Sequence, residues 1–123
     1  MCGVKLGVCA SSWVSLALQL QSLGGKSASL HGHDYRVTVC VEGSLGQGNV
    51  VVDYFWLSRV LEGCLSRYDH KKLNDVLGLK DASAEIMLVD LYRCLQRELE
   101  SKNLRLSRLE ACTPTGFCAY LTP

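Results

Sequence analysis

The sequence predicts an α+β fold, with a mainly antiparallel sheet and helices that form a separate group. Polar and apolar residues alternate with a period of two over residues 34–42, which is typical of a half-buried strand, and apolar residues recur at helical spacing behind Asp53 and Ser83. Because strands and helices segregate along the chain, an antiparallel sheet is favoured over a parallel one. A chain of 123 residues is expected to form one domain over residues 1–123.

Three strands are predicted in the first half of the chain. Residues 4–9 are short and β-branched and form the first strand, whereas residues 10–23 are compatible with its continuation or with a helix. After a glycine-rich loop at residues 24–27, polar and apolar side chains alternate from Asp34 to Glu42, as in a strand with one buried face. Residues 49–52 follow a turn with three glycines and are predicted to return as the second strand of a hairpin.

Two amphipathic helices and two further strands are predicted in the second half. Asp53 is a suitable N-cap for the first helix and Ser83 for the second, with Glu85 in its first turn. Residues 67–80 are predicted to form a loop, and residues 104–111 and 117–121 two strands around a turn. The apolar residues at helical spacing are Leu57, Val60, Leu61, Cys64 and Leu65 in the first helix and Leu88, Leu91, Tyr92, Leu95 and Leu99 in the second.

The charge balance gives no reason to expect a nucleic acid or a membrane surface as partner. Lys and Arg total 13 and Asp and Glu total 12, so the net charge is only +1. The longest apolar stretch, residues 13–20, is too short to span a bilayer, and residues 1–5 do not resemble the start of a signal peptide. The expected location is therefore the cytoplasm.

The seven cysteines are expected to be mostly reduced packing thiols. An odd number leaves at least one thiol free or paired between chains, and no two cysteines have the CxxC spacing of a zinc ribbon or a redox site. Cys64 and Cys94 are expected in the core, whereas Cys112 and Cys118 flank a turn and could approach each other across a hairpin. An intracellular hyperthermophile protein with some disulfides is the alternative.

Three short patterns suggest a functional site. His31 and His33 stand two apart on a predicted strand, so their imidazoles share one face and can hold one metal ion. Asp69 precedes His70, and a carboxylate beside an imidazole can fix its tautomer and raise its basicity. Glu110 can bind the N–H edge of a planar heterocycle with both oxygens. Each pattern alone is more often structural, as a satisfied histidine, a solvated Asp or a surface Glu.

Taken together, these patterns resemble the 6-pyruvoyl-tetrahydropterin synthase and 6-carboxy-tetrahydropterin synthase family over nearly the whole chain. Five blocks carry the resemblance, in the same order and spacing as in the family. They are residues 30–37 (LHGHDYRV) against LHGHxYxV, residues 48–57 against GxVxDFxxL, residues 68–74 (YDHKKLN) against LDHxxLN, residues 82–85 (ASAE) against PTxE, and Glu110, Pro114 and Ala119-Tyr120 against ETP…AxY.

The resemblance implies the tunnelling fold (T-fold), a four-stranded antiparallel sheet with two helices on one face. It implies homotrimers or homohexamers with the active site between subunits, and 7,8-dihydroneopterin triphosphate as the small-molecule substrate. It also implies a zinc ion held by three histidines. In this chain His31 and His33 would be metal ligands, Asp69 and His70 catalytic residues, and Glu110 the residue that binds the pterin ring.

Two positions depart from the family pattern. Ser12 stands where the motif similarity places the third zinc-binding histidine, so zinc is expected with only two family histidines. Ser27 stands where the family has a proton-transferring cysteine, and is the remaining candidate for that catalytic role. Cys9 could replace the missing ligand only across a bulge, because it lies three residues from Ser12, on the opposite face of a regular strand.

Three functions remain open from the sequence. The first is a carbon–oxygen lyase that eliminates triphosphate from 7,8-dihydroneopterin triphosphate and rearranges or cleaves its side chain, which the retained Asp69, His70 and Glu110 favour. The second is a non-catalytic homologue that binds a pterin or purine-like ring, which the joint loss of a metal ligand and the cysteine favours. The third is a purely structural role for the histidines, as buried imidazoles bonded to the backbone.

Overall fold

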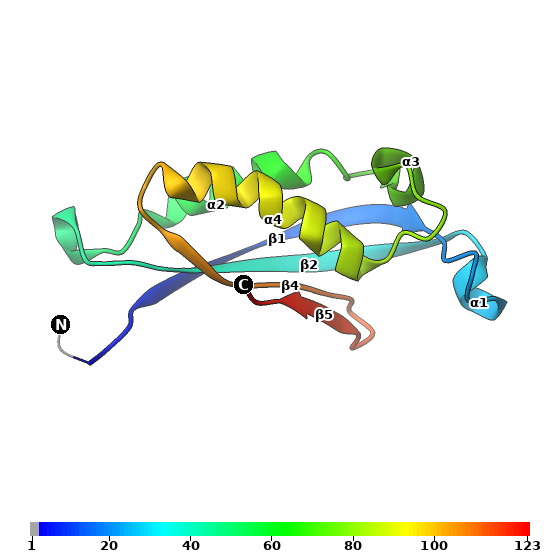
Figure 1. Cartoon of the computed structure of the whole chain (residues 1–123), viewed down its shortest axis with the longest axis horizontal. Coiled ribbons are helices and arrows are strands. Elements are labelled where there is room, and N and C mark those ends of the chain that lie inside the picture. Colours follow the sequence, from blue (N-terminus) through cyan, green and yellow to red (C-terminus); the bar gives the residue numbers. More distant parts are fainter. Residues whose placement is uncertain (1–2) are drawn as a thin grey trace.

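A five-stranded sheet with two long helices on one face forms the protein, for which a computed structural model describes residues 3–123 (Figure 1). The strands are β1 (Gly7–Leu18), β2 (His31–Glu42), β3 (Lys71–Lys72), β4 (Arg105–Cys112) and β5 (Cys118–Leu121), in the order β3-β1-β2-β4-β5. Neighbouring strands are antiparallel, except that the two-residue β3 pairs in parallel with β1. The α+β class and the four antiparallel strands are thus confirmed, and β3 is an addition.

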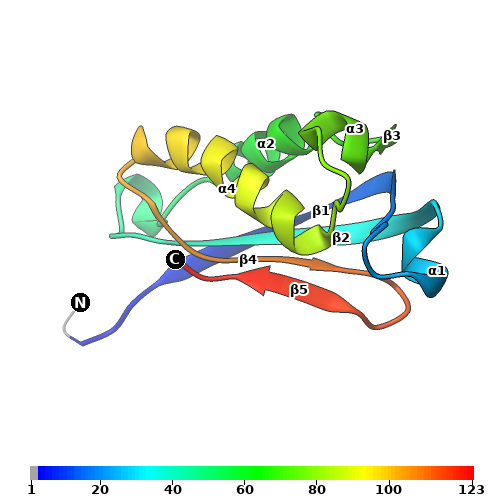
Figure 2. The same cartoon turned by 45° about the vertical axis from the view of Figure 1, so that its right-hand side comes forward.

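The two long helices, α2 (Tyr54–Leu65) and α4 (Ala84–Glu100), pack against each other above the sheet (Figure 2). Both predicted N-caps are confirmed: the Asp53 carboxylate accepts the Phe55 N–H at 3.0 Å, and the Ser83 hydroxyl accepts the Ile86 N–H at 3.2 Å. Among residues 3–123, neither these helices nor any shorter one is long and apolar enough to cross a membrane.

Strands β1 and β2 pair along their whole length, from Gly7 opposite Glu42 to Leu18 opposite His31. The undecided segment after residue 9 therefore continues the first strand to Leu18. Strand β2 starts at His31, three residues earlier than predicted, because the long β1 offers a partner for its backbone groups. Both histidines of the HGH sequence are consequently part of strand β2.

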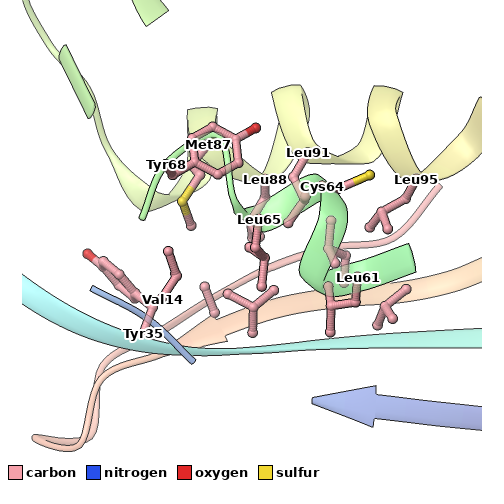
Figure 3. Close-up of a cluster of buried hydrophobic side chains, with 14 of the residues drawn as sticks. Val14, Tyr35, Leu61, Cys64, Leu65, Tyr68, Met87, Leu88, Leu91 and Leu95 are labelled. Atoms are coloured by element: carbon pink, nitrogen blue, oxygen red, sulfur yellow. The ribbon is translucent and has the colours of Figure 1, made fainter. Parts of the chain in front are cut away.

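The core fills the space between the sheet and the two helices (Figure 3). Val14, Leu16 and Leu18 of β1 face the helices, and so do Tyr35 and the following odd-numbered residues of β2. The opposite face of the sheet carries no helix from residues 3–123 (Figure 2). The buried helical residues include Leu57, Leu61, Cys64 and Leu65 of α2 and Leu88, Leu91, Leu95 and Leu99 of α4, as their spacing predicted.

Three local predictions are wrong. Residues 49–52 form no return strand: the 3₁₀ turn η1 (Gln47–Asn49) ends inside this segment, and Gly48 and Asn49 have φ values of 76° and 58°, outside the range of a regular strand. The predicted loop at residues 67–80 holds β3 and the short helix α3 (Leu73–Leu77). The glycine-rich loop at residues 24–27 holds one helical turn, α1 (Gly25–Ala28).

Six of the seven cysteines form disulfides, which overturns the expectation of mostly reduced thiols. Cys9 bonds to Cys40, Cys64 to Cys94, and Cys112 to Cys118, while Cys2 lies outside the described residues. The topology brings these pairs together, since Cys9 is directly opposite Cys40 and Cys112 directly opposite Cys118. Only the pairing of Cys112 with Cys118 could be suspected from the sequence. Disulfides at this density are typical of oxidising compartments or of intracellular hyperthermophile proteins.

Candidate functional site

The two histidines of the HGH sequence lie side by side at the start of β2. Their ring centroids are 4.8 Å apart and their planes are nearly perpendicular. The Nδ1 of His31 lies 2.7 Å from the Ser29 carbonyl oxygen; because a carbonyl only accepts, Nδ1 carries the proton and Nε2 is free. Burial, and secondarily the neighbouring His31, lower the pKa of His33 below its usual value.

Asp69 and His70 form the carboxylate–imidazole pair that the sequence suggested. They lie in the turn between α2 and β3, where an Asp69 carboxylate oxygen is 2.9 Å from His70 Nδ1. The other carboxylate oxygen accepts the Ser15 N–H at 2.9 Å, and the His70 N–H donates to the Ser15 carbonyl at 2.6 Å. The pKa of Asp69 is lowered, first by the Ser15 hydrogen bond and then by the His70 imidazole.

Two neighbouring depressions in the surface bring these groups together, and His33 lines both. The first, which we call the groove, has a volume of about 760 Å³ and is lined by Ser27, His31, His33 and Glu85, with apolar walls from β1, β4 and β5. The second, which we call the hollow, has a volume of about 480 Å³ and is lined by His33 and His70 among others. The structure thus gathers all three histidines, and Ser27 of α1, in one region of the molecule.

A three-histidine zinc site does not fit the side chains that this chain supplies. The register places Leu18 opposite His31 and Leu16 opposite His33, on the same face, so both positions nearest the imidazoles carry buried leucines. Ser12 does not lie near the histidines: it stands opposite Val37, about 13 Å along β2 from His33 at the usual rise per residue. Within residues 3–123, His, Cys, Asp and Glu nowhere gather as three possible ligands.

Cys9 provides no substitute ligand. It is bonded to Cys40 on the helix-free face of the sheet, opposite to the face of the histidines. This agrees with the prediction that Cys9, three residues from Ser12, lies on the opposite face of a regular strand. Two imidazoles alone fall short of the three protein ligands of a catalytic zinc site.

Glu110 lies away from this region of the chain. It stands on the helix-free face, opposite Thr38 and Tyr120, and accepts a hydrogen bond from Arg108 at 3.1 Å. The Arg108 guanidinium also lies over the Tyr120 ring, 4.3 Å from its centroid. Glu110 therefore lines neither the groove nor the hollow.

Several groups at the site were not singled out from the sequence. Glu85, assigned there only to the first turn of a helix, is the one carboxylate among the residues that line the groove. Tyr35 lines the groove together with Glu85, and burial, and then the Glu85 carboxylate, raise its pKa to about 12. Lys71 and Lys72 line the hollow beside His70. The ASAE block within the family-like pattern was the available signal for Glu85.

This arrangement suits proton transfer next to a planar ligand. The carboxylate of Asp69 holds Nδ1 of His70, so the opposite ring nitrogen can take up or release a proton. The apolar walls of the groove can cover a flat ring, and Glu85 can accept hydrogen bonds from its N–H edge. The lysines beside His70 supply positive charge for an anionic group.

Comparison with known proteins gives consistent matches. The family profile of 6-pyruvoyl tetrahydropterin synthase matches residues 9–122. A protein of Archaeoglobus fulgidus assigned as 6-carboxy-5,6,7,8-tetrahydropterin synthase is 26% identical over 85 residues, which cover 69% of this chain and 73% of that protein. Dihydroneopterin monophosphate aldolase of Pyrococcus furiosus is 38% identical over 48 residues, which cover 39% of this chain and 41% of that protein.

Solved structures agree on the fold. The 6-pyruvoyl tetrahydropterin synthase of Caenorhabditis elegans has a TM-score of 0.82 at 17% identity, with 98% of this chain and 96% of that chain covered. An uncharacterised protein of Wolinella succinogenes has a TM-score of 0.75 at 13% identity, with 98% and 99% covered. These likenesses bear out the predicted T-fold.

Proposed function

The chain belongs to the 6-pyruvoyl tetrahydropterin synthase family, and from this premise we propose that it is a lyase acting on a phosphorylated dihydroneopterin. The single observation that carries the proposal is the hydrogen-bonded Asp69–His70 pair beside a hollow that His33 shares with the groove. The proposed substrate is 7,8-dihydroneopterin triphosphate, whose side chain is rearranged or cleaved after elimination. The relatives' names, which refer to a tetrahydropterin synthase and a dihydroneopterin monophosphate aldolase, support a substrate of this class.

Elimination needs a base and a place for the leaving group. As a C–H bond of the side chain breaks, His70 takes the proton on Nε2 while Asp69 stabilises the imidazolium through Nδ1. The electron pair of the C–H bond forms the new double bond, and the C–O bond breaks so that triphosphate departs with its own electron pair. Lys71 and Lys72 lie where they can neutralise that anion.

Ser27 and Glu85 complete the proposed site. A serine hydroxyl is a far weaker acid than the thiol found at this position in the family, so Ser27 is assigned to hydrogen bonding of the substrate side chain, and the proton to His70. Glu85 would hold the N–H edge of the ring in the groove. Glu110 could reach a ring only in the groove of a neighbouring subunit, which agrees with the trimer or hexamer implied by the family. No step is assigned to zinc, because the side chains of this chain do not complete its coordination.

For the location we propose the cytoplasm of a hyperthermophile, because disulfides are rare in an ordinary reducing cytosol and intracellular hyperthermophile proteins are the exception that keeps the cytoplasmic expectation. Counting free thiols in protein extracted from its source under alkylating conditions tests this proposal. More than two reactive thiols per chain would contradict it.

An activity assay on the oxidised protein tests the proposed reaction. The substrates are 7,8-dihydroneopterin triphosphate and the monophosphate, and the readouts are phosphate release and the mass of the pterin product. We expect turnover, and a loss of about 10²- to 10⁴-fold in kcat for His70→Gln. The exposed Asp75→Asn in α3 is the matched control for Asp69→Asn and should keep full activity. Absence of turnover with both substrates, with or without added zinc, would overturn the proposal.

The second candidate is a non-catalytic protein that binds a pterin or purine-like ring. The leucines opposite both histidines favour it, since they leave the groove intact while removing a metal ligand. Calorimetric titration with 7,8-dihydroneopterin would then show binding without turnover, weakened in Glu85→Gln. Binding that is unchanged in Glu85→Gln would contradict the assigned ring contact.

A further inference from the structure

The turn that contains Asp69 and His70 is held by hydrogen bonds to the sheet on one side and to α4 on the other. Toward the sheet, Asp69 and His70 exchange hydrogen bonds with the backbone of Ser15. Toward the helices, the preceding residue, Tyr68, donates its hydroxyl proton to the Asp90 carboxylate of α4 at 2.5 Å. The pair is therefore joined to α4 through one side chain and one hydrogen bond.

Tyr68 and Asp90 lie apart from the groove and the hollow. The Tyr68 ring is only 1% exposed and lies beside Met87 of α4, with its hydroxyl directed away from the sheet (Figure 3). Asp90 also accepts a hydrogen bond from Arg67 at 2.5 Å, which leaves the carboxylate with two charged or polar donors. Neither residue lines the proposed site, so neither has a role in the reaction as described so far.

His70 depends on this support more than an ordinary residue does. Its φ value is 59°, in the left-handed region that residues with a β-carbon adopt only when the surrounding structure holds them. Its side chain is 81% exposed, and the hydrogen bond from Nδ1 to Asp69 fixes the orientation of the imidazole. The direction of the imidazole therefore follows the placement of residues 68–70. Errors of about 1 Å in the placement of a reacting group can cost about 10²-fold in rate.

We propose that Asp90 is a positioning residue for the Asp69–His70 pair and that it acts through the hydroxyl of Tyr68. Asp90 holds Tyr68, Tyr68 places the turn, and the turn sets the geometry in which Asp69 fixes Nδ1 of His70. The inference rests on the proposed function only in taking His70 as the proton-transfer group; the geometric part stands without it.

Three variants separate positioning from simple stability. Asp90→Ala removes the acceptor, Tyr68→Phe removes only the donor hydroxyl and keeps the buried ring, and Asp90→Asn retains an oxygen acceptor at the same place. We expect kcat to fall about tenfold in Asp90→Ala and Tyr68→Phe with KM unchanged, and to recover largely in Asp90→Asn. Arg67→Gln, which leaves the bond between Tyr68 and Asp90 in place, is the matched control and should keep wild-type kcat.

The ¹⁵N chemical shifts of the imidazoles provide a readout that needs no activity. In the wild type, His70 should show one dominant tautomer with the proton on Nδ1, and in Asp90→Ala and Tyr68→Phe a shift toward the mixture seen in free histidine. The signals of His31 and His33 should stay in place, which excludes general unfolding as the cause. An inactive wild type with these shifts would overturn the proposed function but not the positioning role. Unchanged His70 shifts in the folded Tyr68→Phe variant would overturn the positioning role, whatever the activity.

Discussion

At the scale of single residues, the side chain at position 18 decides what the two neighbouring histidines can do. Leu18 stands directly opposite His31 in the antiparallel pair and is buried in the core. Side chains directly opposite each other on one face have β-carbons about 5 Å apart, close enough for two imidazoles to share a metal ion. The leucine thus replaces a possible ligand by an apolar wall, and the histidines remain a pair.

Replacing this leucine tests the register directly. Leu18→His should create three imidazoles on one face and raise the zinc content from near zero to about one ion per chain, because a structural or catalytic zinc needs at least three protein ligands. Elemental analysis and the visible absorption of the cobalt-substituted protein measure the result. Leu18→Asn is the control for polarity at this position. A wild type with one zinc per chain, or a folded Leu18→His variant without zinc, would contradict the assignment.

The pKa of Asp69 gives a second prediction at this scale. Its pKa is lowered in the folded protein, so the carboxylate stabilises the fold above the ordinary pKa and this contribution is lost as the pH falls through the folded value. The free energy of unfolding should therefore decrease below about pH 5, and decrease less steeply in Asp69→Asn. Urea denaturation at a series of pH values measures both slopes. Equal slopes in Asp69→Asn and in the wild type, with Asp75→Asn as control, would contradict the prediction.

Site residues differ in how far the sequence could place them. His31 with His33, and Asp69 with His70, could be recognised because each pair is local in the chain. Ser12 was misplaced because the position opposite a histidine depends on the register between two strands, and that register is set over the full length of β1 and β2. The role of Glu110 stays a prediction, since the sequence does not show the face of the sheet on which it lies, and that face is the one opposite to the histidines.

At the scale of elements, the helices were predictable and the irregular segments were not. The apolar spacing and caps of α2 and α4 are properties of short sequence windows, and the structure confirms them. The expected hairpin at residues 49–52 failed because Gly48 and Asn49 turn the backbone into the left-handed region. The short α3 is held by the buried Asn74 amide, which bonds to the backbone of the distant Gln19 and of the nearby Leu79 and Lys80. Such contacts leave no periodic pattern in the sequence.

Asn74 provides a test of how such a segment is held. Asn74→Ala would remove the side-chain partner of the Gln19 N–H and of three part-buried backbone carbonyls, and should lower the free energy of unfolding by about 3 kcal/mol. Guanidinium denaturation of the oxidised protein measures the difference. Asp75→Ala, the exposed neighbour in the same helix, serves as control and should change stability by less than about 0.5 kcal/mol. A loss as small as the control's would show that the amide contacts carry little of the stability.

The disulfides also differ as structural elements. Cys64–Cys94 connects α2 to α4 across 30 residues, whereas Cys112–Cys118 closes a loop with a separation of only 6. Because the loss of chain entropy grows with loop length, replacing both cysteines by alanine should cost about 4 kcal/mol for the first pair and about 2 kcal/mol for the second. Thermal and chemical denaturation of the two double variants compares them. A larger loss for the shorter loop would show that loop entropy does not govern these crosslinks.

At the scale of the whole molecule, one sheet face and two sheet edges have no covering element in the part of the chain that the structure describes. The helix-free face is mostly polar, with Ser11 bonded to Thr38 and Arg108 to Glu110, and it also exposes the large rings of Trp13 and Tyr120. The outer edge of β5 presents unpaired backbone groups, which natural proteins usually cover. Both features agree with the expectation of a ring-shaped assembly.

Sedimentation equilibrium tests this expectation without any assumption about activity. The oxidised wild type should sediment with three or six times the chain mass of 13.5 kDa at micromolar concentration. Glu110 could bind a ring only in the groove of another subunit. A monomeric protein would therefore exclude both the assembly and the binding of the ring by Glu110. The exposed substitution Asp75→Asn should leave the mass unchanged.

The disulfide between Cys9 and Cys40 has a consequence for how the chain folds. It joins β1 and β2 near the end of the pair that lies farthest from their connection, which runs through residues 19–30. A slip of one residue between these strands would turn every side chain of one strand to the wrong face. Once this bond has formed, the register between β1 and β2 can no longer shift. The two paired strands then keep their alignment while the remaining strands and helices fold. Oxidative refolding should then pass through a species in which this crosslink is already present.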